Sequence, residues 1–448
     1  MRYTPHTAAD QERMLRTIGL DSIEALYRHV PATLCGRAKI NLPEGLTELT
    51  VRKRLAALAS RNATNLDWSL FLGGGIYNHF IPSAVDATIS RSEFSTSYTP
   101  YQPEVSQGTL QALFEYQTLI CQLTGMEVAN AAVYDGASAA AEAALMSRRI
   151  QPESRRRVLM SRALHPQYRA VVAAYLQNLN DMQLEEVPFD ASGATDVEAL
   201  SRRLNDQSMC VLVGYPNFFG VIEDLAAIKT ACIKAGAQLI SVTTEPLALG
   251  LLKPPGEFAV DIAVGEGQSL GVPMSLGGPA FGFFACQKKF VRSMPGRLVG
   301  ETVDIEGRRG FVLTLATREQ HIRREKATSN ICTSQTLCAL GATVFMSLLG
   351  KSGLRRVAEV NVLRAHDALS KLRQCATVEL AFNGPFFNEF VLRSADVERL
   401  FAHCAAKKIV PGISLEKDYP ELRDCFLVCV TEMNEREEIE RLVDTLTE

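Results

Sequence analysis

The sequence lacks the cysteine and histidine patterns of a metal site or a disulfide framework. Its eleven cysteines include no Cys-x-x-Cys pair, and its seven histidines are scattered along the chain. Most cysteines stand in apolar runs, such as Cys210 in Met-Cys-Val-Leu-Val and Cys429 in Phe-Leu-Val-Cys-Val. A reduced thiol in such a run behaves as a small hydrophobic group. We therefore predict buried, reduced cysteines and no metal ligands.

An excess of charge of one sign is also absent. The 47 basic and 50 acidic side chains give a net charge of −3 and are spread over the whole chain. This balance argues against a nucleic-acid groove and against a polybasic membrane anchor. The residues Met1 to Asp10 contain no apolar segment typical of a secretory signal, and no uninterrupted apolar run is long enough to span a bilayer. The sequence predicts a cytoplasmic protein that acts on small molecules or on protein partners.

Short apolar segments alternate with helical patterns through the centre of the chain. Strands are expected at Val128–Val133, Arg157–Ser161, Met209–Tyr215, Gln238–Val242, Asp261–Val264 and Ala280–Cys286. Helices are expected at Thr109–Thr124, Gly136–Arg149, Pro166–Leu179, Val197–Asn205 and Asp224–Ala235. This alternation predicts an α/β fold with a doubly wound, mostly parallel sheet covered on both faces.

The flanking regions have different patterns. Thr7 is a candidate N-cap of a first short helix that ends at Gly19, and Thr47–Arg61 is expected to be amphipathic, with Leu55 and Leu58 inward. After about residue 310 the order becomes helix, paired strands, helix, strand and helix, beginning with a helix at Gly353–Gln374. We predict three parts: an N-terminal helical arm at 1–65, a large α/β domain at 66–310 and a small α+β domain at 311–448.

The segment Tyr134–Glu142 follows a predicted strand and opens an alanine-rich helix. Backbone N–H groups at Gly136, Ala137 and Ser138 would then point at an anion on the positive end of the helix, which is typical of a phosphate cup. The alternative is that Asp135 or Ser138 simply caps the helix.

Three other segments are candidates for contact with a ligand or a partner. The glycines at 73–75 predict a loop near a pocket, although no dinucleotide-binding fingerprint surrounds them. Tyr98–Gly108 is a stiff polar loop, which either contacts a partner or packs as a turn. The charged run Arg318–Lys326 permits a Glu319–Arg323 pair on a solvated helix face, or an anion-binding or subunit-facing role. A lone histidine such as His165 is more often structural.

The segment Asp261–Pro279 contains no lysine, and neither does any position between Gly256 and Gln287. The nearest lysines are Lys253 and Lys288. This absence matters because of a family resemblance that runs nearly end to end. The chain resembles the P-protein of the glycine cleavage system, and within it the alpha half, or subunit 1. The stretches that carry the resemblance are Thr17–Leu20, Phe71–Phe80, Tyr98–Gly108, Tyr134–Ala137, Leu249–Pro255 and Thr317–Gln335.

The resemblance implies the fold of the fold-type I pyridoxal-phosphate enzymes. In that fold a lysine after a strand holds the cofactor, and an acidic residue on an earlier strand pairs with the pyridine nitrogen. Matching Pro273 and the Gly277–Pro279 run to the catalytic half of the family puts Gln268 or Ser269 at the lysine position. Thr243 or Thr244 stands where the acid is expected. The resemblance therefore implies that this chain does not bind pyridoxal phosphate covalently and contains no catalytic residue of its own.

The resemblance also implies an activity and partners. The family's complex, a heterotetramer with a lysine-bearing beta subunit, decarboxylates glycine and transfers the aminomethyl group to the lipoyl arm of the H-protein. Pyridoxal phosphate belongs to the beta subunit, and this chain would support that subunit's site in trans. The candidates for these contacts are Tyr98, Tyr101, Gln102, Glu104, Gly74 and Asn78. Two alternatives remain: a stand-alone enzyme that uses Lys253 or Lys288, and a pseudo-enzyme with a regulatory or scaffold role.

Overall fold

The computed structural model describes residues 5–37 and 41–448. The chain divides into two compact units, Met1–Thr64 and Asn65–Glu448. The first unit contains α1 (Ala8–Ile18), the 3₁₀ turn η1 (Glu24–Tyr27), α2 (Ala32–Arg37) and α3 (Glu48–Ala59). Thr7 caps α1 as predicted, in a reciprocal capping box with Asp10, and Gly19 ends the helix with φ 73°. The prediction that Leu55 and Leu58 point inward is wrong, because both are exposed.

The second unit is built on a mixed sheet. Within the described residues, seven strands follow one another in the order β2 (Val128–Ala129), β8 (Gly282–Cys286), β7 (Ile262–Glu266), β6 (Gln238–Thr243), β5 (Ser208–Gly214), β3 (Arg157–Ser161) and β4 (Gln183–Val187). The strands from β4 to β7 are parallel, whereas β8 and β2 run antiparallel to their neighbours. This arrangement confirms the doubly wound, mostly parallel sheet.

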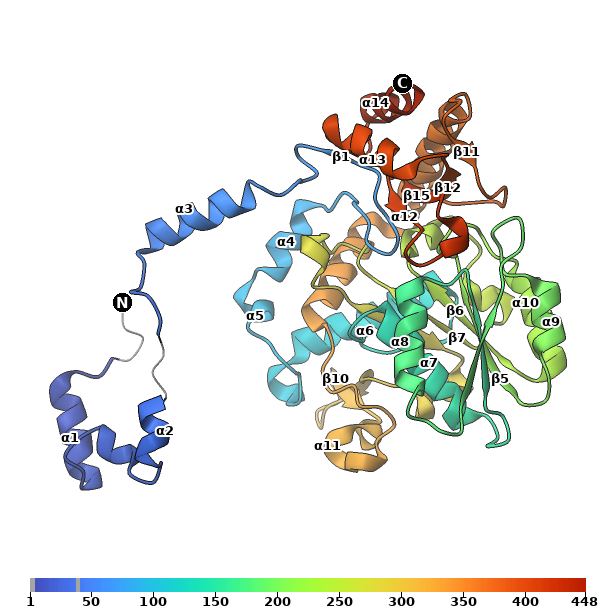
Figure 1. Ribbon diagram of the computed structural model, residues 1–448. Helices are drawn as coiled ribbons and strands as arrows, with labels where there is room; N and C mark the ends of the chain where they lie inside the picture. The colour runs from blue at the N-terminus through green and yellow to red at the C-terminus, as the bar shows by residue number, and fades with distance from the viewer. Residues whose placement is uncertain (1–4, 38–40) are drawn as a thin grey trace. The chain divides into compact units, whose positions relative to one another are not determined.

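The central strands β5 to β8 are fully buried and mostly apolar, and helices pack on both sides of the sheet (Figure 1). In β5, Cys210 and Leu212 pack on the side of α7 (Gly136–Ile150) and α8 (Pro166–Leu176). Val211 and Val213 pack on the opposite side, with α6 (Gln107–Thr124), α10 (Leu225–Ala235) and the first half of α12 (Thr336–Leu372). The shorter α9 (Val197–Arg203) lies beside α10.

A smaller sheet lies at the C-terminal end of the chain. It contains β11 (Glu379–Leu380), β12 (Glu389–Arg393), β15 (Cys425–Cys429) and β14 (Ile413–Ser414). Its core is shared with α13 (Val397–Ala406), α14 (Arg436–Thr447) and the second half of α12. The short strand β1 (Ser69–Leu70) pairs with β13 (Ile409–Val410), so the segment that follows β1 starts in this region. The remaining elements include α4 (Ser83–Ile89), α5 (Ser92–Ser95) and the β9–β10 hairpin (Leu298–Val303, Arg309–Thr314).

Helix α12 connects the two cores. Ala339, Ala342 and Phe345 lie in the large core, whereas Ala365 and Leu369 lie in the small one. By length and composition alone α12 could cross a membrane, contrary to our expectation that no such run exists. It is nevertheless interrupted at Gly350, where φ is 59°, and it packs against α4 and α6. We interpret α12 as a core helix. The predicted domain boundaries at residues 65 and 310 stay a prediction.

The charged run near residue 320 does not form the expected helix. It is divided into η7 (Ala316–Arg318), α11 (Gln320–Arg323) and η8 (Arg324–Lys326). Arg318 is buried and donates to the carbonyl oxygens of Leu315 and Gly296. Glu319 pairs with Arg297 at 3.6 Å, and the predicted Glu319–Arg323 pair is not formed. Only the start of the run packs into the fold, through Arg318 and Glu319, whereas His321 to Lys326 are exposed to solvent.

Candidate functional site

The carboxyl ends of the parallel strands β6 and β7 meet at one edge of the sheet, where ligands bind in open α/β folds. Glu266 is the last residue of β7 and is buried. Its Oε2 accepts a hydrogen bond from the backbone N–H of Gly136, at the start of α7, at 3.0 Å. Its Oε1 accepts from the N–H groups of Gly267 and Phe281 at 3.0 and 3.2 Å. Position 136 has no room for a side chain, because a Cβ atom there would lie 2.7 Å from the Glu266 backbone nitrogen.

Two N–H donors of the predicted phosphate cup, those of Gly136 and Ser138, therefore already bind carboxylates of this chain. The N–H of Gly136 is taken by Glu266, and the N–H of Ser138 donates to Asp135 Oδ1 at 2.7 Å. Asp135 is the N-cap of α7, which is the alternative that the sequence left open. Ala137 lies between these two positions in the first turn. Burial raises the pKa of Glu266 to about 7, although the N–H groups of Gly136 and Phe281 oppose that rise.

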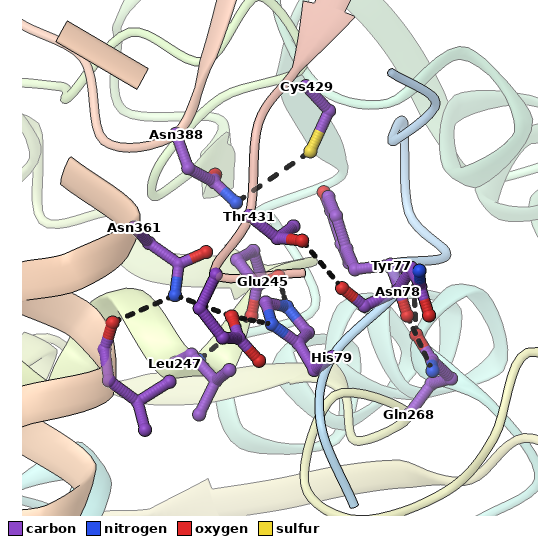
Figure 2. A network of polar contacts seen from close by, with 12 residues as sticks. Tyr77, Asn78, His79, Glu245, Leu247, Gln268, Asn361, Asn388, Cys429 and Thr431 are labelled. Atoms are coloured by element: carbon purple, nitrogen blue, oxygen red, sulfur yellow. Dashed lines mark hydrogen bonds and ion pairs between the residues drawn. The ribbon is translucent and has the colours of Figure 1, made fainter. Parts of the chain in front are cut away.

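Gln268, a candidate for the lysine position, is also buried and fully engaged (Figure 2). Its Oε1 accepts from the Tyr77 N–H at 2.8 Å, and its Nε2 donates to the Tyr77 carbonyl at 3.0 Å. The same Nε2 donates to the Val272 carbonyl at 2.7 Å. Ser269, the other candidate, is buried, and its Oγ has no hydrogen-bond partner among the described residues. Gln268 therefore fixes the backbone of a segment that lies 191 residues away in sequence.

The glycines at 73–75 were expected to form a loop near a pocket, and the segment that contains them, Phe71–Phe80, has no helix or strand. It is held along its length by residues next to the large sheet and by the C-terminal sheet. Gly74 donates its N–H to Glu389 Oε1 at 2.6 Å, and its carbonyl lies 2.7 Å from His165 Nε2. The Asn78 carbonyl accepts from Thr431 Oγ1 at 2.7 Å. Gly74 and Asn78, which are both partly buried, thus anchor the Phe71–Phe80 segment.

Tyr77 is the centre of this segment, with only 1% of its surface exposed. Its hydroxyl donates to Glu389 Oε2 at 2.9 Å and lies 3.4 Å from Thr244 Oγ1. Burial raises the pKa of Glu389 to about 8, and the bonds from Gly74 and Tyr77 oppose that rise. Thr244 follows β6 and is one of the two candidates for the acidic position. Tyr77 therefore contacts both Gln268 and Thr244.

His79 binds two carboxylates in the interior. Its Nε2 lies 2.8 Å from Glu245 Oε2, and its Nδ1 lies 2.8 Å from Glu432 Oε2. Burial alone would lower the pKa of His79, but the two carboxylates, Glu245 first, outweigh it and raise the pKa to about 10. Asn361 also donates to Glu432, at 2.9 Å. Glu245 follows β6 of the large sheet and Glu432 follows β15 of the C-terminal sheet, so the network around His79 (Figure 2) joins the two cores.

The other predicted contact residues lie apart from this interior network, on the surface. Tyr98, Tyr101, Gln102 and Glu104 are all exposed. Arg297 holds the Tyr101 side chain in place. It donates a hydrogen bond to the Tyr101 hydroxyl at 3.2 Å, and its guanidinium lies 5.3 Å from the Tyr101 ring centroid. The structure thus separates the six predicted in-trans residues into two partly buried anchors, Gly74 and Asn78, and four exposed positions.

Sequence reasoning missed Glu266, His79, Glu389 and Glu432, and it included Tyr77 only as part of the loop from Gly73 to Asn78. One signal was available, since Glu266 is a carboxylate in an otherwise apolar strand, and a buried carboxylate requires donors. The others become meaningful only through contacts between distant segments. Among the described residues no group of His, Cys, Asp or Glu could hold a metal ion.

Comparison with known proteins places these features in a family. Residues 1–446 match the family described as glycine cleavage system P-protein. The chain belongs to that family. It is similar to a probable glycine dehydrogenase (decarboxylating) subunit 1 of Geobacillus thermodenitrificans, with 49% identity over 99% of this chain and 98% of the relative. A crystal structure of a glycine decarboxylase (P-protein) of the glycine cleavage system, in inhibitor-bound form, superposes with a TM-score of 0.93 and 44% identity, covering 100% and 99% of the two chains.

More distant structures share the fold alone. A sphingosine-1-phosphate lyase of Burkholderia pseudomallei has a TM-score of 0.67 at 15% identity and covers 91% of this chain and 92% of its own. With the P-protein match, this likeness confirms the predicted fold-type I architecture. The lysine-free edge of the sheet can therefore be compared with the family's cofactor position.

Proposed function

We propose that this chain is the lysine-free subunit of a two-chain glycine decarboxylase. With a lysine-bearing partner it decarboxylates glycine and supports transfer of the aminomethyl group to the lipoyl arm of an H-protein. The observation that carries the proposal is the family membership over residues 1–446 in a chain with Gln268 or Ser269 at the lysine position. An uncharged amide or hydroxyl cannot supply the amine that this chemistry needs.

The cofactor does not fit the residues of this chain. Pyridoxal phosphate requires free N–H donors for its phosphate group, a lysine amine for its aldehyde and an acidic side chain for its ring nitrogen. Here Gly136 is already bound to Glu266, and Gln268 is bound to Tyr77. These contacts support placing the cofactor on the partner subunit, and with it the chemical steps. We also propose that the complex is cytoplasmic.

The role of this chain is then to shape the partner's site. The exposed residues Tyr98, Tyr101, Gln102 and Glu104 are our candidates for contacts in trans, since Arg297 holds Tyr101 in one orientation while leaving it accessible. Aromatic and amide side chains on a rigid loop are suited to contact a partner's substrate cleft. Gly74 and Asn78 act indirectly, by fixing the Phe71–Phe80 segment.

The test is to locate the cofactor in the purified complex. We expect the chain purified alone, after incubation with pyridoxal phosphate, to show no visible absorbance from a lysine-bound cofactor. After borohydride reduction of the complex, peptide mass spectrometry should find the pyridoxyl group on a lysine of the partner. A stoichiometric label on Lys253 or Lys288 would instead support a stand-alone enzyme. Lys253 is half exposed and lies 3.9 Å from Glu257, which is an ordinary surface pair.

A further inference from the structure

Two groups of this chain lie where the parts of a bound cofactor would be expected. The first is the Glu266 carboxylate. It is a buried carboxyl group at the N-terminus of an α-helix of 15 residues, and it accepts hydrogen bonds from Gly136 there and from Gly267, Gln268 and Phe281. A phosphate group at this position would use the same kind of donors. Both groups cannot bind the Gly136 N–H together.

The second is Tyr77. Its backbone pairs with Gln268, a candidate for the lysine position, and its hydroxyl lies 3.4 Å from Thr244, a candidate for the acid position. In the fold-type I enzymes the cofactor ring lies between a lysine and an acid. A residue that contacts both positions, and that is 1% exposed, lies in the space of that ring.

We infer that the chain fills its own ancestral cofactor site, with the Glu266 carboxylate in place of the phosphate and Tyr77 in place of the ring. The inference deepens the proposed function and rests on it for the meaning of the two positions. It assigns a purpose to the Phe71–Phe80 segment, which Gln268 and Glu389 hold inside the site. The site then serves as a rigid joint between the two sheets instead of a binding pocket.

Removing the two groups should reopen the site in two separable steps. The probes are inorganic phosphate and 4-deoxypyridoxine 5′-phosphate, which has no aldehyde and so cannot react with surface lysines. Binding to the full-length chain is measured by isothermal titration calorimetry. We expect no saturable binding to the wild type. Glu266→Ala should bind both probes with a Kd at least about tenfold below the weakest Kd that the wild-type titration could detect, which corresponds to about 1.4 kcal/mol. Adding Tyr77→Ala should give about another tenfold for the ring-bearing probe only.

Matched controls distinguish these gains from loosened packing. Glu266→Gln keeps an oxygen acceptor for Gly136 and should bind like the wild type. Tyr419→Ala removes another fully buried tyrosine, from the cluster with Phe189 and Phe219, and should not increase binding. Saturable binding of either probe to the wild type overturns the inference, and so does equal phosphate affinity in folded Glu266→Ala and Glu266→Gln.

Circular dichroism reports whether each variant is folded. If Glu266→Ala does not fold, Glu266→Ser takes its place, and the wild-type titration still decides whether the site is filled. These readouts do not depend on enzyme activity. An inactive complex with a closed wild-type site would count against the proposed function alone.

Discussion

Replacement of His79 by alanine is expected to destabilise the protein by about 3 to 5 kcal/mol at pH 7. The substitution removes the only group placed, among the described residues, between Glu245 and Glu432, at 2.8 Å from each. The Glu245 side chain is 2% exposed and that of Glu432 14%, so water cannot replace the lost cation efficiently. Two facing carboxylates in the interior would then repel each other or take up a proton. The urea midpoint of unfolding, followed by circular dichroism, measures this loss.

The effect should depend on pH in a defined direction. The folded pKa of His79 is about 10, above the ordinary value of 6.5. The folded state therefore holds a proton that the unfolded state loses between these values. Stabilisation by His79 is complete below pH 6.5 and declines as the pH rises through about 10. The difference between the wild type and His79→Ala should shrink accordingly at alkaline pH.

His403→Ala is the matched control. The His403 side chain is 43% exposed and pairs with Glu448 at 3.5 Å on the surface, so its loss should cost less than about 0.5 kcal/mol. Similar midpoints for the two alanine variants, or a His79→Ala difference that does not vary with pH, would contradict a charged His79 in this network.

Gln268→Ala should produce the second large loss of stability. Three buried groups, the N–H and carbonyl of Tyr77 and the carbonyl of Val272, would lose their side-chain partner. Each buried unsatisfied group costs about 1 to 3 kcal/mol, so the sum is roughly 3 kcal/mol or more. Hydrogen exchange of the Tyr77 amide, measured by mass spectrometry of the peptide that spans the Phe71–Phe80 segment, should accelerate strongly.

Ser269→Ala tests the neighbouring candidate position with the same replacement. The Ser269 hydroxyl is buried and makes no hydrogen bond among the described residues, so its removal should be neutral or slightly stabilising. If Ser269→Ala is as harmful as Gln268→Ala, the pairing of Gln268 with the Tyr77 backbone is not what holds the segment.

The large sheet was predictable because local pattern and burial agree there. The strand at Arg157–Ser161 is found at its predicted bounds, and most strands and helices of the central part lie within a few residues of prediction. The edge strand Gln183–Val187 was missed because three of its five residues are polar and only Val187 is buried, so the strand gives no core signal. The first half of α12 was missed because Gly341 and Gly350 weaken a helical pattern. Tertiary packing overrides that weakness, since Gly341 approaches Val85 and Ile89.

The contents of the candidate site were not predictable from the sequence. The absence of a lysine between Gly256 and Gln287 can be read directly, whereas the match of Gln268 or Ser269 to the lysine position stays a prediction. The contact of Gln268 with Tyr77 spans 191 residues and that of Gly74 with Glu389 spans 315, and no local pattern encodes such contacts. The same limit applies to His79, whose two carboxylates, Glu245 and Glu432, lie 166 and 353 residues further along the chain.

Reconstitution of activity from separate chains tests the central claim most directly. This chain, a lysine-bearing partner subunit and lipoylated H-protein would be purified separately, and exchange of labelled bicarbonate with the glycine carboxyl group would be measured. We expect negligible exchange with either P-protein chain alone, and strong exchange when the two chains are mixed and associate. Exchange by this chain without the partner, or full exchange by the partner without this chain, would contradict its assignment as the supporting subunit.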